Sequence, residues 1–81
     1  MGMLRVLSHR GDDTLTWDTP KAEQGDPDAL AAVREAERIF AETRAHGGTA
    51  YVVEGERPPR PIEQFDPHVE QIVLIPRVIG G

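Results

Sequence analysis

The sequence predicts an α+β domain in which one long helix packs across a mixed sheet of four to five strands. Two strand-like runs, 3–8 and 14–18, are joined by a short turn that contains Gly11, which favours a hairpin. A helix of about five turns is predicted over 26–46, long enough to lie across a sheet. A continuous apolar run, 72–75, lies near the C-terminus and is typical of a central strand. The predicted order of elements is β-β-α-β-(β)-β.

The first two runs alternate in side-chain character, as strands with two different faces do. On the first run, one face carries Leu4 and Val6, and the other face carries Met3, Arg5 and Leu7. On the second run, Leu15 and Trp17 are expected to point inward. The segment between the runs, 9–13, has the composition of a turn.

Local signals predict both ends of the helix. Asp26 is a good N-cap, and Pro27 suits the first helical position because its missing N–H is not needed there. His46 is expected in the last turn, and Gly47 is expected to end the helix in the left-handed conformation. The apolar stripe that should face the sheet consists of Leu30, Val33, Ala36 and Phe40, with Ile39 nearby.

The remaining segments are assigned from composition. The polar stretch 19–25 contains a proline and is predicted to be a loop. A third strand is predicted over 49–54, an exposed proline-rich loop over 55–61, and a short additional strand over 62–65. The last strand, 71–75, does not alternate, so we expect it to be buried on both faces or to lie at the centre of the sheet.

Size and composition exclude several classes of function. The chain has 81 residues, which make one domain and leave little room for both a core and a catalytic cleft, so we predict that it is not an enzyme. The net charge is −5, with 14 acidic and 9 basic residues, which disfavours nucleic acid as a partner. No secretory or membrane-spanning run is present, so we expect a cytoplasmic location and no membrane partner.

Three motifs that suggest chemistry are interpreted as structural. Ser8, His9, Asp12 and Asp13 are residue types of a nucleophile triad, but they share one turn, whereas a triad converges from separate elements. The three histidines lack the spacing of a metal site, so no metal and no cofactor is predicted. The Pro-x-x-Pro spacing at 58–61 is interpreted as a stiff loop.

The C-terminus carries the strongest functional signal. We divide the chain into a folded domain, 1–76, and a flexible tail, 77–81, that ends in Gly80 and Gly81. Glycine has no Cβ, so such an end can enter a narrow enzyme tunnel. The tail reads Pro76-Arg77-Val78-Ile79-Gly80-Gly81. Because the chain has no cysteine, any sulfur that it carried would have to be on the terminal carboxylate.

The Pro-x-Val-x-Gly-Gly ending resembles that of molybdopterin-synthase small subunits and, more loosely, those of thiamine sulfur carriers and ubiquitin-like modifiers. Together with the order of elements, it is similar to the ubiquitin-like β-grasp superfamily. The resemblance implies that an E1-like enzyme adenylates the Gly81 carboxylate with ATP. A modifier would then be transferred to a target amine, with an E2-like enzyme and a deconjugating protease as further partners.

The resemblance leaves three functions open. Molybdopterin-type carriers show a Gly-Asp-Glu-like turn before the last strand, whereas this chain has Phe-Asp-Pro-His-Val-Glu over 65–70. We therefore favour a prokaryotic protein modifier over a sulfur carrier that forms a C-terminal thiocarboxylate for cofactor synthesis. A third alternative is a non-covalent protein-binding module whose Gly-Gly end is incidental.

Two further sets of residues bear on these functions. Lys21 is the only lysine, so it is the only side chain through which modifier chains could be linked. More apolar side chains are present than one sheet face needs, namely Leu4, Val6, Met3, Leu7 and Ile75. The candidates for a second, outer face are Met3, Arg5 and Leu7. They form either a partner-docking surface on the outer face of the sheet or ordinary edge packing.

Overall fold

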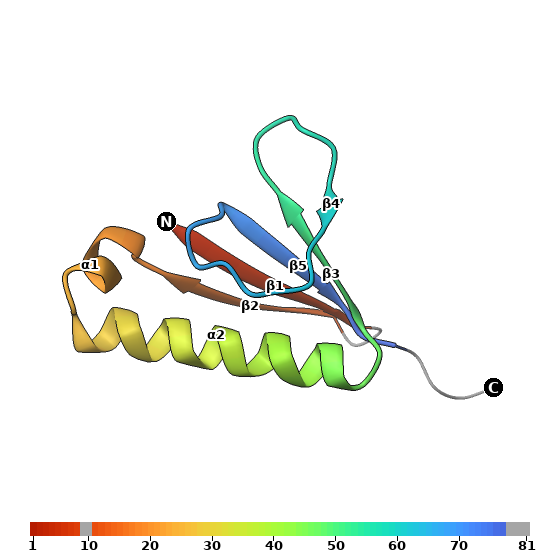
Figure 1. Cartoon of the computed structure of the whole chain (residues 1–81), viewed down its shortest axis with the longest axis horizontal. Coiled ribbons are helices and arrows are strands. Elements are labelled where there is room, and N and C mark those ends of the chain that lie inside the picture. Colours follow the sequence, from red (N-terminus) through yellow and green to blue (C-terminus); the bar gives the residue numbers. More distant parts are fainter. Residues whose placement is uncertain (9–10, 78–81) are drawn as a thin grey trace.

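The computed structural model describes residues 1–8 and 11–77. A five-stranded mixed sheet forms one layer, and a long helix crosses one of its faces as the second layer (Figure 1). The elements are β1 Gly2–Ser8, β2 Gly11–Trp17, α1 Thr19–Glu23, α2 Pro27–Ala45, β3 Thr49–Val53, β4 Arg60–Pro61 and β5 Gln71–Ile75. The predicted α+β class, with one helix packed across a mixed sheet, is therefore confirmed.

The strand order in the sheet is β2-β1-β5-β3-β4. β1 pairs with β2 in antiparallel and with β5 in parallel orientation, and β5 pairs with β3 in antiparallel orientation. The C-terminal strand therefore lies at the centre of the sheet, as its apolar run predicted. Because β1 and β5 are parallel, their C-terminal ends lie side by side at the same end of the sheet. From there the chain continues after β5 to Pro76.

The ends of α2 follow the predicted local signals. The Asp26 side chain accepts a hydrogen bond of 3.0 Å from the Ala29 N–H, and Pro27 occupies the first turn. After the helix, Gly47 has a φ of 88°, which a residue with a Cβ rarely adopts. His46, expected in the last turn, is instead the C-cap residue.

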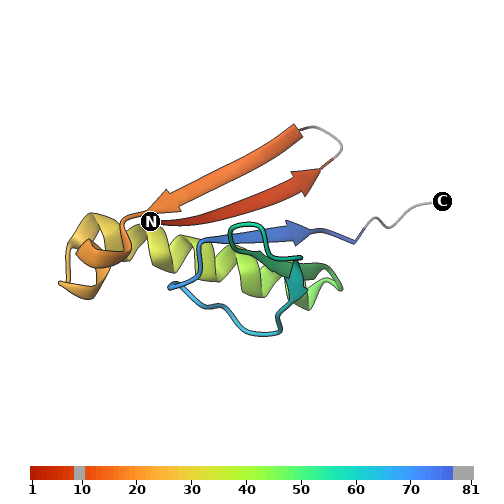
Figure 2. The same cartoon turned by 90° about the horizontal axis from the view of Figure 1, so that it is seen from above.

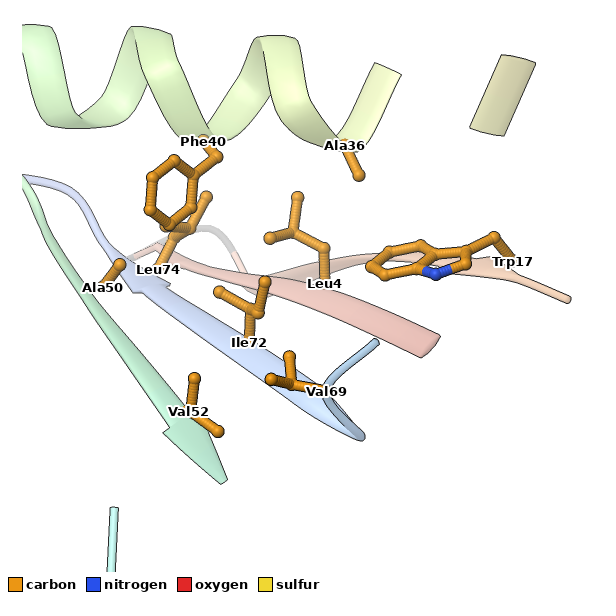
Figure 3. Close-up of a cluster of buried hydrophobic side chains, with 9 residues drawn as sticks. All are labelled: Leu4, Trp17, Ala36, Phe40, Ala50, Val52, Val69, Ile72 and Leu74. Atoms are coloured by element: carbon orange, nitrogen blue, oxygen red, sulfur yellow. The ribbon is translucent and has the colours of Figure 1, made fainter. Parts of the chain in front are cut away.

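One core lies between α2 and the inner face of the sheet (Figure 3). Phe40 and Ala36 point from the helix toward Leu4, Ile72 and Leu74 on the central strands. The complete buried cluster is Leu4, Trp17, Ala36, Phe40, Ala50, Val52, Val69, Ile72 and Leu74. Both Trp17 and Phe40 belong to it, as expected.

Aromatic contacts close the core at one side. The ring of Phe65 lies 5.8 Å from the Trp17 ring and 5.8 Å from the Phe40 ring, measured between centroids. The Trp17 indole Nε1–H donates a hydrogen bond of 3.0 Å to the Pro67 carbonyl, so its one polar group is satisfied. The indole also lies directly over Gly2, where a Cβ would be only 2.2 Å from Trp17 Cε2.

In the N-terminal half of the chain, α1 and β2 differ from the prediction. The segment 19–25, expected to be a loop, contains the short helix α1. Its start is stabilised locally, because the Asp18 side chain accepts a hydrogen bond from the Lys21 N–H and Pro20 lies in the first turn. β2 begins at Gly11, earlier than the expected Thr14, because pairing with β1 extends along the hairpin.

The fourth strand also differs. β4 consists of Arg60–Pro61, within the expected loop, and the expected strand over 62–65 is absent from the described structure. An edge strand tolerates a proline, and β4 is an edge strand. The Ile62 N–H continues the contact by donating a 3.0 Å hydrogen bond to the Ala50 carbonyl. Ile62 and Phe65 then pack against the core, which explains their apolar character without strand pairing.

Of the two alternatives expected for the last strand, the structure shows the central position in the sheet and not burial on both faces. Ile72 and Leu74 are fully buried, but Val73 is half-buried and Ile75 is 43% exposed. The physical reason is that, in the part of the chain that the structure describes, a helical layer covers only one face of the sheet (Figure 2).

Candidate functional site

The predicted functional tail begins where the central strand leaves the sheet. Ile75, the last residue of β5, is paired with Thr49 on β3. Pro76 is half-buried and Arg77 is exposed. Val78, Ile79, Gly80 and Gly81, which include the two predicted donor residues, lie outside the described residues. The site is therefore described up to Arg77.

Arg77 packs against the C-terminal end of α2. A Cβ placed on Gly47 would lie 3.0 Å from Cδ of Arg77, so the arginine stem passes directly over this glycine. The carbonyl end of a helix carries partial negative charge, which favours a nearby guanidinium. The base of the tail thus lies at the end of the helix, beside the glycine that terminates it.

A cavity of about 400 Å³ lies beside this contact. Pro76 and Arg77 form one wall, Val6 and Asp13 of the hairpin form another, and α2 closes it with Arg38, Ile39, Glu42, Thr43 and His46. The residues around the cavity come from segments that are distant in the sequence. Of these residues, the sequence predicted a functional role only for Pro76 and Arg77.

Charged side chains of α2 border this cavity. Arg38 donates a hydrogen bond of 2.5 Å to Glu35 Oε1 and one of 2.8 Å to Glu42 Oε2. The hydrogen bond from Arg38 lowers the pKa of Glu35 below its ordinary value. Desolvation opposes this shift, and the positive charge of Arg38 adds to it. The same pair raises the pKa of Arg38. All three groups are exposed, so solvent weakens these interactions.

The predicted docking residues Met3, Arg5 and Leu7 lie together on the face of the sheet opposite α2. All three are half-buried. In register, Arg5 lies between Thr14 of β2 and Val73 of β5. Its Nε is shielded from solvent and has no hydrogen-bond partner among the described residues. The structure thus brings these residues together around one guanidinium, while their docking role stays a prediction.

Lys21, the predicted linkage residue, is exposed on α1 at the opposite end of the molecule from Arg77 (Figure 1). It lines a depression of about 300 Å³ that also includes Met1, Asp18, Asp26 and Asp28. Lys21 therefore shares this depression with Met1 and three aspartates.

The described histidines lie at different ends of α2. His46 Nδ1 is 2.8 Å from the Glu42 carbonyl oxygen, whereas His68 Nε2 is 3.0 Å from Glu23 Oε1. His9 lies outside the described residues. Across residues 1–8 and 11–77, no group of three histidine, aspartate or glutamate residues could hold a metal ion. The side chains of Ser8 and Asp12 likewise lie outside the described set.

Comparisons with protein-family models, curated proteins and solved structures returned no match to this chain. Within the described part of the chain, neither helix combines the length and apolar character needed to cross a bilayer. The functional argument therefore depends on the residues and their geometry alone.

Proposed function

We propose that the chain is a ubiquitin-like β-grasp protein that acts as a prokaryotic protein modifier. Its Gly81 carboxylate would be adenylated by an E1-like enzyme and transferred to a target amine. One observation supports this more than any other: β5 is central, parallel to β1, and leads through Pro76 and Arg77 to a Gly-Gly terminus. A central strand anchors the base of the tail firmly to the domain.

The β-grasp assignment is supported by topology. The order β2-β1-β5-β3-β4, with a parallel central pair and a single long helix between β2 and β3, is compatible with a β-grasp. In such a domain the C-terminal segment leaves from the end of a central strand. This position suits a protein that binds several partner enzymes in turn.

The proposed chemistry takes place on the terminal carboxylate. A Gly81 carboxylate oxygen attacks the α-phosphorus of ATP, an acyl–adenylate forms, and pyrophosphate leaves. A target amine then attacks the Gly81 carbonyl carbon, AMP leaves, the amine loses a proton, and an amide bond forms. Catalysis belongs to the activating enzyme, with an E2-like enzyme and a deconjugating protease as further partners. The need for ATP favours the cytoplasm as the place of activation.

The first test is ATP–pyrophosphate exchange with a cognate E1-like enzyme. Deletion of Gly81, and separately Gly80→Leu, should each reduce exchange by about 10²-fold or more, because activation requires precise placement of the carboxylate. Glu63→Ala, on an exposed residue remote from the tail, is the matched control and should retain exchange. All variants should keep the wild-type melting temperature. Wild-type exchange that both tail variants preserve would contradict the proposal and favour a non-covalent binding module.

The second test separates a modifier from a sulfur carrier. Arg77 is the last basic residue, so trypsin should leave Val78-Ile79-Gly80-Gly81 attached to the modified lysine of a target. Detection of that remnant by mass spectrometry supports a modifier. A sulfur carrier would instead show replacement of one terminal oxygen by sulfur on the intact chain, with no remnant on other proteins.

A further inference from the structure

We propose that a pocket between α1 and the N-terminal half of α2 binds one aromatic side chain of a partner protein, next to which the partner carries a basic residue. We call this the α1–α2 pocket. It lies where three segments meet: α1, the N-terminal half of α2, and residues 67–68 ahead of β5. Its apolar lining consists of Trp17, Ala22, Leu30, Val33 and Pro67.

The α1–α2 pocket has the size of one aromatic ring. Its volume is about 160 Å³, and an apolar cavity of about 150 Å³ in an engineered protein binds benzene. Leu30 and Val33 are only half-buried, so a ligand can remove more of their apolar surface from water. Trp17, which also lines the pocket, already lies 5.8 Å from the Phe65 ring, measured between centroids. A phenyl ring would therefore extend an existing aromatic cluster.

Polar contacts fix the walls of the pocket. α1 has no buried residue, so burial does little to hold it in place. The Asp18 side chain caps its first turn, and Glu23 Oε1 lies 3.0 Å from His68 Nε2. The hydrogen bond from the Trp17 indole to the Pro67 carbonyl joins a third pair of segments. These contacts hold the walls in place without filling the space between them.

Charge at the rim selects a basic neighbour for the aromatic residue. Among the described residues that line the pocket, Glu23 and His68 are the ionisable ones. His68 Nδ1 also lies 3.7 Å from Asp66 Oδ1. Two carboxylates thus flank one imidazole, so the rim is negative overall whether or not His68 carries a proton. A lysine or arginine beside the aromatic residue complements this rim, whereas an acidic residue would be repelled.

The α1–α2 pocket is remote from the tail. α1 and the N-terminal end of α2 lie at the opposite end of the molecule from Arg77 (Figure 1). A partner bound in the pocket would therefore leave the base of the tail uncovered. The inference goes beyond the proposed function, because it requires no chemistry at Gly81.

The test uses the full chain, isotopically labelled, and NMR titration with the blocked dipeptide acetyl-Phe-Lys-amide. We expect saturable shifts in the millimolar range at the amides of Ala22, Val33 and His68. Emission of Trp17, the one tryptophan of the chain, should change over the same range. Acetyl-Phe-Glu-amide should bind at least about threefold more weakly, because its charge meets exposed carboxylates. Acetyl-Gly-Lys-amide, which lacks the ring, should produce no saturable shift at these amides.

Two pairs of variants locate the binding. Ala22→Leu should fill the pocket and weaken binding of acetyl-Phe-Lys-amide by at least about tenfold. Ala41→Leu, on an exposed position of α2 outside the pocket, is the matched control and should bind like the wild type. Glu23→Lys should remove the preference for the lysine dipeptide, whereas Glu37→Lys, on the exposed face of α2, should keep it. If Ala22→Leu melts earlier than the wild type, the Glu23→Lys pair alone decides.

Three results would overturn the inference: no saturable binding of acetyl-Phe-Lys-amide, equal affinity for the lysine and glutamate dipeptides, or shifts confined to the outer face around Arg5. Acetyl-Leu-Lys-amide tests another occupant, and tighter binding of this dipeptide would show that the aromatic assignment is wrong. No activating enzyme is present, so failure here and failure of the proposed function are distinguishable.

Discussion

The two faces of the sheet differ in how deeply their side chains are buried, although the apolar run 72–75 contributes side chains to both faces. On β5, Ile72 and Leu74 point to the helix and are fully buried, while Ile75 points to the opposite side and is 43% exposed. The inner face is closed by α2, and Phe65 and Val69 seal its side. Over residues 1–8 and 11–77, no helix covers the outer face (Figure 2). The difference shows that apolar content marks a central strand but does not tell how many layers cover it.

The comparison separates stability from interaction. Side chains of the inner face contribute most of the buried apolar area, so they should dominate the free energy of unfolding. Among the described residues, side chains on the outer face of the sheet contribute less burial. Substitutions on the two faces should therefore have very different costs.

The largest effect is expected for Phe40→Ala, at the centre of the inner face. Phe40 is 4% exposed and contacts Phe65, so its removal leaves a cavity that the small core cannot fill. The expected loss is about 3–5 kcal/mol in the free energy of unfolding, which a domain of this size barely tolerates. Urea or thermal unfolding measures it. An unchanged melting curve would contradict the assignment of this core.

A matched pair on β5 tests the comparison directly. Ile72→Ala should destabilise by about 2–5 kcal/mol, because the side chain is fully buried. Ile75→Ala, on the same strand, should cost less than about 1 kcal/mol, because the side chain is partly solvated already. Chemical denaturation of both variants gives the difference. Equal costs would mean that another element covers the outer face in solution.

A smaller effect is expected where the hairpin meets the core. Gly2→Ala would place a Cβ 2.2 Å from the buried Trp17 indole, which must then shift. The expected cost is about 1–3 kcal/mol, typical of overpacking. Trp17 fluorescence should change in the folded state as well. Met1→Ala, on an adjacent residue that is 80% exposed, is the control and should leave both measurements unchanged.

The smallest effect is expected at the exposed Glu35–Arg38 pair. The pKa of Glu35 is lowered in the folded state, chiefly by the hydrogen bond from Arg38. The stabilisation from this pair is therefore present above the ordinary glutamate pKa and is lost as pH falls through the lowered value. An NMR titration of the Glu35 carboxyl should show the lowered pKa. Arg38→Gln should return it toward the ordinary range, while Arg34→Gln, elsewhere on the exposed face, should not.

What the sequence by itself determined is mostly local. Asp26, Pro27 and Gly47 specified α2 because capping bonds and backbone conformation involve neighbouring residues. Alternation specified the hairpin, and the run 72–75 specified a central strand. The short helix α1 was also encoded locally, by Asp18 and Pro20, and a search for caps within the polar segment would have found it.

Only the tertiary structure decided the features that depend on distant partners. The position of β4 follows from pairing with β3, and the apolar Ile62 and Phe65 serve packing instead of a strand. The open outer face, the contact of Arg77 with Gly47 and the cavity at the base of the tail each require segments far apart in the chain to meet. Sequence patterns report the preferences of single segments, whereas these features arise from the three-dimensional arrangement in which several segments share one surface.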